Sequence, residues 1–185
     1  MSLRFEEASN ESYDVMAKVR KEHFNSLEKA RIKLLFDLKM RKQGTGIVLA
    51  QIHKPSELLK FFMTQDDKDA VAAYNYVVTL DKAAWGTADD ADRVRLIRHE
   101  LRHAYLDSDA LDPYKLIPHD VLDFRVELEL NADDMFWGNR VAAAARKIYD
   151  SQHPKQEHLP GAAPKGKAKP KTKTRKGPGL QVVPS

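Results

Sequence analysis

The sequence predicts an α+β fold in residues 1–150, followed by a disordered tail in residues 151–185. Stretches rich in β-branched and aromatic residues fall in the first half of residues 1–150, and the long helical patterns fall in the second half. Such grouping is typical of α+β folds and not of alternating α/β folds. The hydrophobic share of 42% and the charged share of 31% are typical of a soluble globular protein.

An N-terminal helix and three strands are expected before residue 82. The helix follows from an amphipathic pattern over 11–24. Within 30–39, the residues Ile32, Leu34 and Phe36 share one side of an extended chain, which predicts a strand that two nearby glycines end. The remaining elements of this half are two further strands at 47–54 and 74–81 and a short helix or turn at 56–62 with Ser56 as its cap.

The stretch WGTADDADRVRLIRHELRHAYL predicts a helix over 88–105. Thr87 takes the N-cap position and Asp90 follows three residues later, as in a variant of the capping box. Apolar residues at three- and four-residue spacing form its buried face, namely Ala91, Val94, Ile97, Leu101 and Ala104. A second long helix is expected over 119–149, which completes the domain.

The centre of this helix, HELRH, has the spacing of a zinc-peptidase motif. His99 and His103 are four residues apart, so both rings project from one helix face and can reach a single metal ion. Glu100 is rotated by about 100° around the helix axis and can act as general base on a metal-bound water. The chain has no cysteine, so any metal is held by His, Asp or Glu. The alternative is a surface helix whose histidines pair with acids such as Asp107.

A catalytic zinc ion usually has three protein ligands and one open position. We rank His119 first as the third ligand, because Pro113 and Pro118 favour a loop that lets the chain return to the motif helix. Glu129 ranks second and Glu127 third; the alternative for both glutamates is a solvated helix face.

Further acids and tyrosines are candidates for supporting roles. Asp120 could hydrogen-bond a ligating imidazole and fix its orientation, or it could cap the following helix. Asp107 and Asp109 could orient a ligand too, although solvent-facing positions are the simpler expectation. Tyr105 and Tyr114 are candidates for stabilising an oxyanion, with a core position as the alternative for Tyr105.

The stretches RHELRHAYL, PHDVLDF and ARIKLLFDLK…YVVTLDKAAW resemble the putative phage metallopeptidase family, which is similar to the SprT-like, or Spartan-like, zinc peptidases. The resemblance covers about residues 11–137 and implies a zincin-like minimal core with one zinc ion per chain. Phe124 follows the third histidine by five residues, against four in SprT-like proteins, and the lack of cysteine excludes the zinc ribbon of some of them. By this resemblance the zinc ligands are His99, His103 and His119, with Glu100 as the base.

These observations together predict a zinc-dependent metallopeptidase that hydrolyses a protein or peptide substrate. Glu100 takes the proton of the metal-activated water and delivers it to the leaving amine. The strand at 74–81 could offer an edge on which an extended substrate pairs. The sequence shows no apolar run that could span a membrane and no secretion signal, so a cytoplasmic location is expected, in the host if the chain is phage-encoded.

The tail could bind nucleic acid without sequence preference. Residues 151–185 contain eight Lys or Arg and one acid, a net charge of +7, which leaves −3 for residues 1–150. The alternative for the tail is a solubilising role. The alternative to a peptidase is a non-catalytic zinc module that binds nucleic acid through this tail. A tail that binds DNA would also suit a peptidase that cleaves DNA-bound proteins. The phosphate-binding candidates are Lys165, Lys167, Lys169, Lys171, Lys173, Arg175 and Lys176.

Deletion of residues 151–185 is expected to abolish retention of the protein on immobilised DNA, because phosphate neutralisation by these cations supplies the affinity. Circular dichroism should show that the remaining domain stays folded. Unchanged DNA retention would rule out the tail as the nucleic-acid-binding segment.

Overall fold

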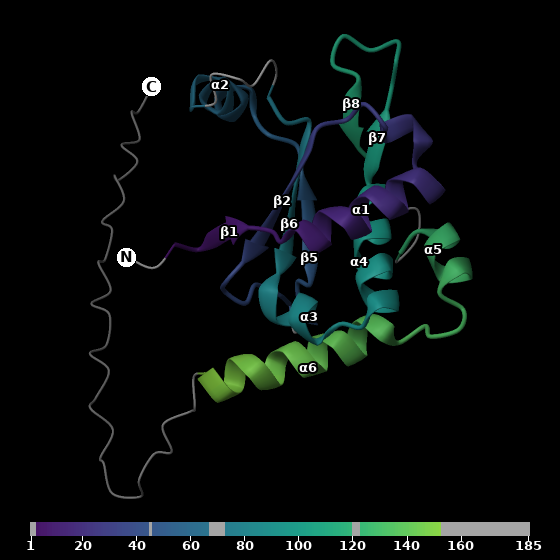
Figure 1. Cartoon of the computed structure of the whole chain (residues 1–185). Coiled ribbons are helices and arrows are strands. Elements are labelled where there is room, and N and C mark those ends of the chain that lie inside the picture. Colours follow the sequence, from purple (N-terminus) through teal and green to yellow (C-terminus); the bar gives the residue numbers. More distant parts are fainter. Residues whose placement is uncertain (1–2, 45, 67–72, 120–122, 153–185) are drawn as a thin grey trace, which may run out of the picture. The chain divides into compact units, whose positions relative to one another are not determined.

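The chain folds into an α+β structure, as the order of its sequence patterns predicts. Figure 1 shows the computed structural model, which describes residues 3–44, 46–66, 73–119 and 123–152. Apart from its first two residues, the predicted tail lies outside the described residues, and so does Asp120. Across the part of the chain that is described, no helix is both long and apolar enough to cross a membrane.

A four-stranded sheet with the order β1-β2-β6-β5 forms the centre of the fold. The strands β2 and β6 are parallel, whereas β1 and β5 run antiparallel to their neighbours. Sequence predicts three of these strands but not the first, because three residues are too short to show alternation. The strands are β1 (Phe5–Glu7), β2 (Ile32–Asp37), β5 (Ala50–His53) and β6 (Tyr76–Asp81).

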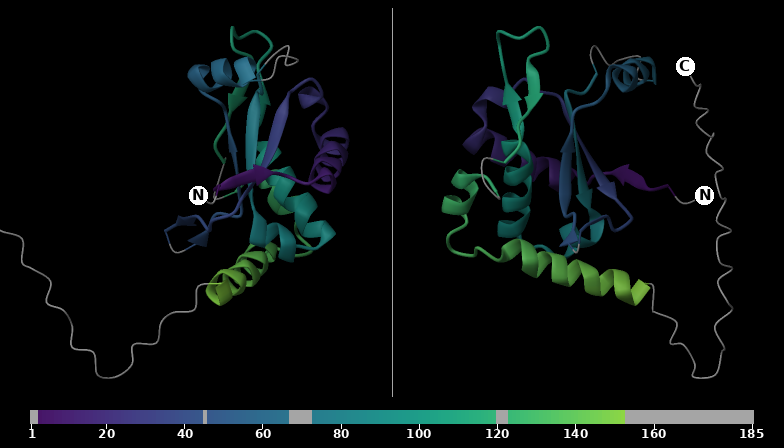
Figure 2. Two further views of the ribbon diagram at one scale, coloured as in Figure 1. Left: turned by 60° about the vertical axis from the view of Figure 1, so that its left-hand side comes forward. Right: turned by 180° about the vertical axis from the view of Figure 1, so that it is seen from behind.

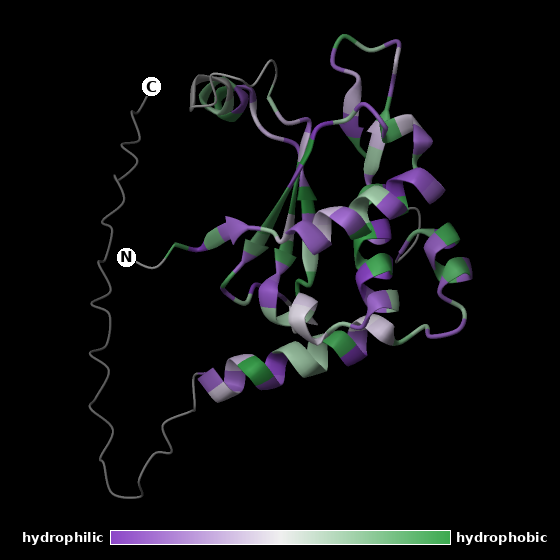
Figure 3. Cartoon of the chain, viewed as in Figure 1, coloured by the Kyte–Doolittle hydropathy of each residue, from purple (hydrophilic) through white to green (hydrophobic). Residues whose placement is uncertain are grey.

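One face of this sheet packs into the hydrophobic core. Ile32, Leu34 and Phe36 are all buried in the main core cluster, which confirms the predicted apolar side of β2. Figure 3 shows the matching run of hydrophobic residues along the central strands. The strand pairing puts alternate residues on opposite faces, so the register also places Tyr76 and Val78 of β6 on the core side.

Helices α1 and α4 pack against each other on one side of the sheet, as the two views in Figure 2 show. Helix α6 packs on α3 and also contacts α4. The helices are α1 (Asn10–His23), the 3-10 turn η1 (Asn25–Leu27), α2 (Glu57–Asp66), α3 (Lys82–Thr87), α4 (Asp90–Arg102), α5 (Arg125–Leu130) and α6 (Trp137–Gln152).

Two small hairpins flank the sheet. The glycine-containing break predicted after β2 is a hairpin, in which Gly44 adopts a φ of +59°, a conformation that suits glycine. The predicted helix or turn after β5 is α2, and the Ser56 Oγ accepts a hydrogen bond from the Leu59 amide at 3.3 Å. The hairpin strands are β3 (Lys42–Gln43) with β4 (Gly46–Ile47), and β7 (Ala104–Leu106) with β8 (Tyr114–Leu116).

The start of the motif helix differs from the prediction. Thr87 is the last residue of α3, and Asp89 is the N-cap of α4, with its carboxylate accepting a hydrogen bond from the Asp92 amide. The predicted cap is wrong because Thr87 belongs to the six-residue helix α3, so the N-cap of α4 falls two residues later. Along α4, Ile97 and Leu101 are buried as predicted, whereas Ala91 is exposed.

The predicted long helix over 119–149 is two helices, α5 and α6, joined by residues 131–136. Polar side chains in this joint compete with helical hydrogen bonding. The Asp134 carboxylate accepts a hydrogen bond from the Phe136 amide at 3.2 Å, and the Asn131 side chain accepts one from Arg98. The joint lets α6 change direction and pack on α3.

Candidate metal centre

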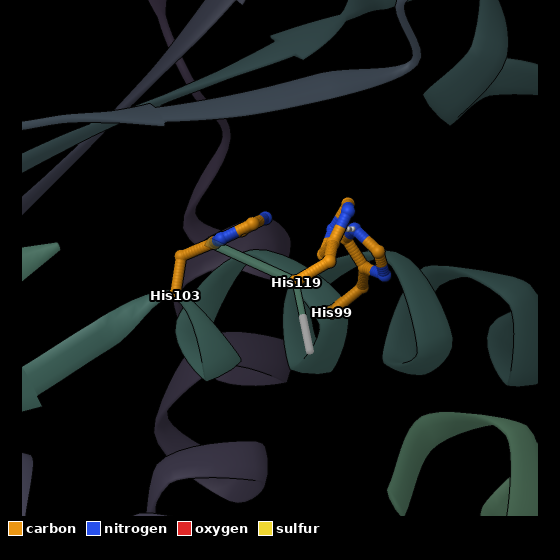
Figure 4. Close-up of side chains that lie close together, drawn as sticks. All are labelled: His99, His103 and His119. Carbon is orange, nitrogen blue, oxygen red and sulfur yellow. Dashed lines mark hydrogen bonds between the residues drawn. The ribbon is translucent and has the colours of Figure 1, made fainter. Parts of the chain in front are cut away.

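Three histidines converge at the C-terminal end of α4. Helix α4 ends at Arg102, and His103 is its C-cap residue in right-handed helical conformation, so His99 and His103 keep the spacing of one helical turn. Figure 4 shows the ring of His119 overlapping that of His99 in this view, with the His103 ring pointing toward them, and the ligand nitrogens of the three residues lie close together. The structure thus brings together the two motif histidines and the first-ranked third residue.

The spacing of the ring nitrogens suits a single metal ion. The ligand nitrogens of the three histidines all lie within 4.8 Å of one another, and His99 Nε2 is 3.2 Å from His119 Nε2. Two nitrogens bound tetrahedrally to one zinc ion are roughly 3.3–3.4 Å apart, given Zn–N bonds of about 2.05 Å. The observed separation therefore matches two corners of a tetrahedral site.

Hydrogen bonds at the Nδ1 atoms hold two of the rings in place. His103 Nδ1 donates to the Ile117 carbonyl at 2.7 Å, and His99 Nδ1 lies 3.1 Å from the Asp123 carboxylate. Both contacts leave Nε2 free to bind a metal, which is the usual arrangement of metal-binding histidines. Burial lowers the pKa of both His99 and His103 and favours the neutral imidazole that binds metal.

Asp123 makes a contact with His99 of the kind considered for Asp120; Asp120 itself lies outside the described residues, so its role stays a prediction. The stretch PHDVLDF contains both acids, so the signal for an orienting carboxylate is present there. Spacing alone cannot choose between them, because the choice depends on which side chain faces His99 in the fold.

The segment predicted as a loop between His103 and His119 contains a hairpin. Strands β7 and β8 pair antiparallel, and the Ile117 amide donates to the His103 carbonyl at 2.8 Å. The Tyr76 hydroxyl lies within hydrogen-bond distance of the carbonyls of Tyr105 (3.1 Å) and Lys115 (2.8 Å), which ties both hairpin strands to the sheet. The hairpin is what returns the chain to α4.

Phe124 packs against the rings of all three histidines. Phe124 is 6% exposed, and the centroid of its ring lies 5.9 Å from that of His99, 4.7 Å from that of His103 and 4.9 Å from that of His119. This apolar ring keeps water away from one side of the imidazoles and restricts their rotation.

The two glutamates ranked as alternative ligands lie outside the histidine cluster. Glu127 is fully buried, and its Oε2 accepts a hydrogen bond from Arg98 Nε at 2.8 Å while its Oε1 accepts one from an Arg102 nitrogen at 3.1 Å. Glu129 is exposed. A solvated face, the alternative considered for both glutamates, therefore holds for Glu129 and is wrong for Glu127.

Glu100 lies beside the histidines and is held by the sheet. It is 6% exposed, and its Oε2 accepts a hydrogen bond from the Ile52 amide of β5 at 2.7 Å. Burial raises the pKa of Glu100 to about 7, although the Ile52 amide and the charge of Arg41 oppose the shift. A carboxylate that titrates near neutrality has the property expected of a general base.

An open cleft of about 730 Å³ gives access to Glu100 and all three histidines. Its walls come from the β3–β4 hairpin, β5, α4 and the first turn of α6. Neither Tyr105 nor Tyr114 is among the described residues that line it: Tyr105 is 51% exposed, and Tyr114 packs edge-on against Tyr76. Asp107 and Asp109 lie in the turn of the β7–β8 hairpin, also outside that lining.

Comparison with known proteins identifies a family for the chain. A family model described as "Putative phage metallopeptidase" matches residues 3–151. No curated protein and no solved structure matches the chain.

Replacement of Glu127 by alanine is expected to lower the free energy of unfolding by about 3–5 kcal/mol, because it leaves the guanidinium groups of Arg98 and Arg102 without their buried carboxylate. Urea denaturation monitored by circular dichroism measures the change. Glu129→Ala, on the same helix but exposed, is the control and should stay within about 0.5 kcal/mol of the wild type. Equal losses in the two variants would contradict this assignment.

Proposed function

The chain belongs to the putative phage metallopeptidase family, and we propose that it is a zinc-dependent peptidase whose metal is held by His99, His103 and His119. The observation that carries this proposal is the convergence of three imidazoles next to a buried glutamate in an open cleft. Three protein ligands with one position left for water are typical of catalytic zinc sites.

The donor set favours zinc or another late transition metal over magnesium and calcium. Three imidazole nitrogens suit zinc and other late transition metals, whereas magnesium and calcium prefer oxygen ligands. Asp123 reaches the cluster through His99 Nδ1, which is the role of a carboxylate that orients a ligand. When bound, zinc supplies a Lewis acid that lowers the pKa of its water to about 7 and polarises the substrate carbonyl.

Glu100 is proposed as the general base. Its Oε2 is engaged by the Ile52 amide, which fixes the carboxylate at the cleft and leaves Oε1 to take a proton from the attacking water. The same oxygen then returns the proton to the leaving amine. The hydrogen bond from β5 prevents the side chain from rotating away between these two steps.

An extended substrate is proposed to pair with β5. The strand at 74–81, the edge suggested by the sequence, is not an edge: β6 lies between β2 and β5. Among the described strands β5 pairs only with β6, and Ala50 and Gln51 line the cleft. The Asp81 amide donates to the Leu49 carbonyl, so the alternation of an antiparallel ladder directs the backbone groups of Ala50 outward, toward a substrate.

The nucleic-acid partner remains a prediction from the sequence, because the basic residues 165–176 lie outside the described part of the chain. A peptidase that acts on nucleic-acid-associated proteins is compatible with the proposed site. No feature of the cleft depends on that partner.

The wild-type protein is expected to bind one zinc ion per chain, and His99→Ala or His119→Ala should lower zinc affinity by at least about 100-fold, more than the loss typical of an orienting residue. Plasma mass spectrometry and chelator competition measure stoichiometry and affinity. Glu129→Ala should retain wild-type affinity. A wild type that binds no zinc, or a Glu129→Ala variant that loses zinc as His119→Ala does, would refute the ligand set.

Glu100→Gln is expected to retain zinc but to lose about 10²–10⁴-fold in peptide hydrolysis, the usual contribution of a general base. The amide oxygen of glutamine can still accept the hydrogen bond of Ile52, so the fold should be preserved. Cleavage of fluorogenic peptides, with Glu129→Gln as the control, measures the loss. Wild-type rates in Glu100→Gln would remove Glu100 from the mechanism.

A further inference from the structure

Part of the lining of the metal-site cleft is apolar. Leu96 lies on α4 three residues before His99 and four before Glu100, so all three share one helix face. Other apolar residues of the lining come from two segments that are far apart in the sequence. The large apolar lining residues are Ile47 in β4, Val48 and Leu49 after it, Leu96 in α4, Met135 in the joint before α6, and Trp137, the first residue of α6.

Three of these lining residues, which together we call the apolar wall, belong to the hydrophobic core or pack against it. Leu96 is 3% exposed and lies in the main core cluster, and Trp137 packs against both core clusters. Leu49 likewise contacts both clusters. These three residues are therefore held by packing, as in preformed binding pockets.

Met135 is the exposed part of the wall. Its side chain is 66% exposed although it lines the cleft, so it buries further apolar surface only when something enters. Methionine adapts to ligands of different shape because its side chain is unbranched and polarisable. The neighbouring Phe136 is 73% exposed but does not line the cleft, which offers an internal comparison.

The charged side chains of the cleft disfavour acidic substrate side chains. Among the described residues that line it, none is lysine or arginine, whereas Glu100 and Asp123 both carry carboxylates. Apart from the bound metal ion, whose charge the proposed ligands already engage, an acidic substrate side chain would find no cation in this lining and would meet the carboxylates of Glu100 and Asp123. An apolar side chain would gain contacts and lose no hydrogen bond.

We propose that this apolar wall is a specificity pocket, which selects peptides with a large apolar side chain at one of the two residues flanking the scissile bond. The inference rests on the proposed peptidase function. Leu96 and Trp137 form the fixed part of the pocket, and Met135 forms its adjustable rim.

The zinc-loaded, full-length protein and a mixture of peptides of known sequence provide the first test. Mass spectrometry of the products should show leucine, phenylalanine or methionine at one fixed position beside the cleaved bond at least about 10-fold more often than aspartate or glutamate, the scale that apolar pockets achieve. Cleavage without preference at either flanking position, or with a preference for acidic residues, would overturn the proposal.

Met135→Asp places a carboxylate in the wall, and Phe136→Asp places one on the next residue, outside the cleft. Met135→Asp should lower cleavage beside apolar residues by about 10-fold or more and raise the share of lysine and arginine at the same position. Phe136→Asp should keep the wild-type profile. Identical profiles for the two variants would remove Met135 from the pocket.

Hydroxamates provide a measurement that does not depend on turnover. Zinc-loaded wild type should bind a peptide hydroxamate with a leucine side chain at least about 10-fold more tightly than one with an aspartate side chain, and Met135→Asp should remove this difference. Zinc-dependent binding with this preference but without peptide cleavage would contradict the proposed function and support the pocket. Cleavage combined with equal hydroxamate affinities would contradict the pocket alone.

Discussion

The hydrogen bond from the Ile52 amide to Glu100 is the contact on which the site depends. It joins the motif helix α4 to the edge strand β5, so it fixes the distance between the histidines and the strand proposed to bind substrate. A buried carboxylate is unfavourable unless a donor compensates for lost hydration. That requirement makes the position of α4 against the sheet and the position of the proposed base a single structural condition.

A second polar contact fixes the opposite side of the site. The buried Glu127 joins α5 to Arg98 and Arg102 of α4, and the Asn131 side chain accepts a further hydrogen bond from Arg98. Helix α5 begins directly after Phe124, so this ion pair also sets where Phe124 and Asp123 meet the histidines. The two faces of α4 thus serve different purposes: one presents the histidines and Glu100, and the other anchors the segment that orients them.

Sequence alone predicts the elements with a long periodic pattern and the residues within one helix. The faces of β2 and α4 and the spacing of His99 and His103 belong to this class. Short elements are not predicted, because the three residues of β1 or the six of α3 are too few to show a period. The N-cap of α4 is therefore Asp89 and not the predicted Thr87, which belongs to α3. Contacts between distant segments are not predicted either, since the burial of Glu127 depends on Arg98 and Arg102, which are 29 and 25 residues away in the sequence.

The central claim is that three imidazoles and no carboxylate bind one zinc ion. X-ray absorption at the zinc edge of the purified protein tests it most directly, because imidazole rings give a distinctive scattering signal. The predicted spectrum has about four nitrogen or oxygen neighbours near 2.0 Å, three of them from imidazole. A spectrum with only two imidazoles and a carboxylate in the third position would contradict the claim.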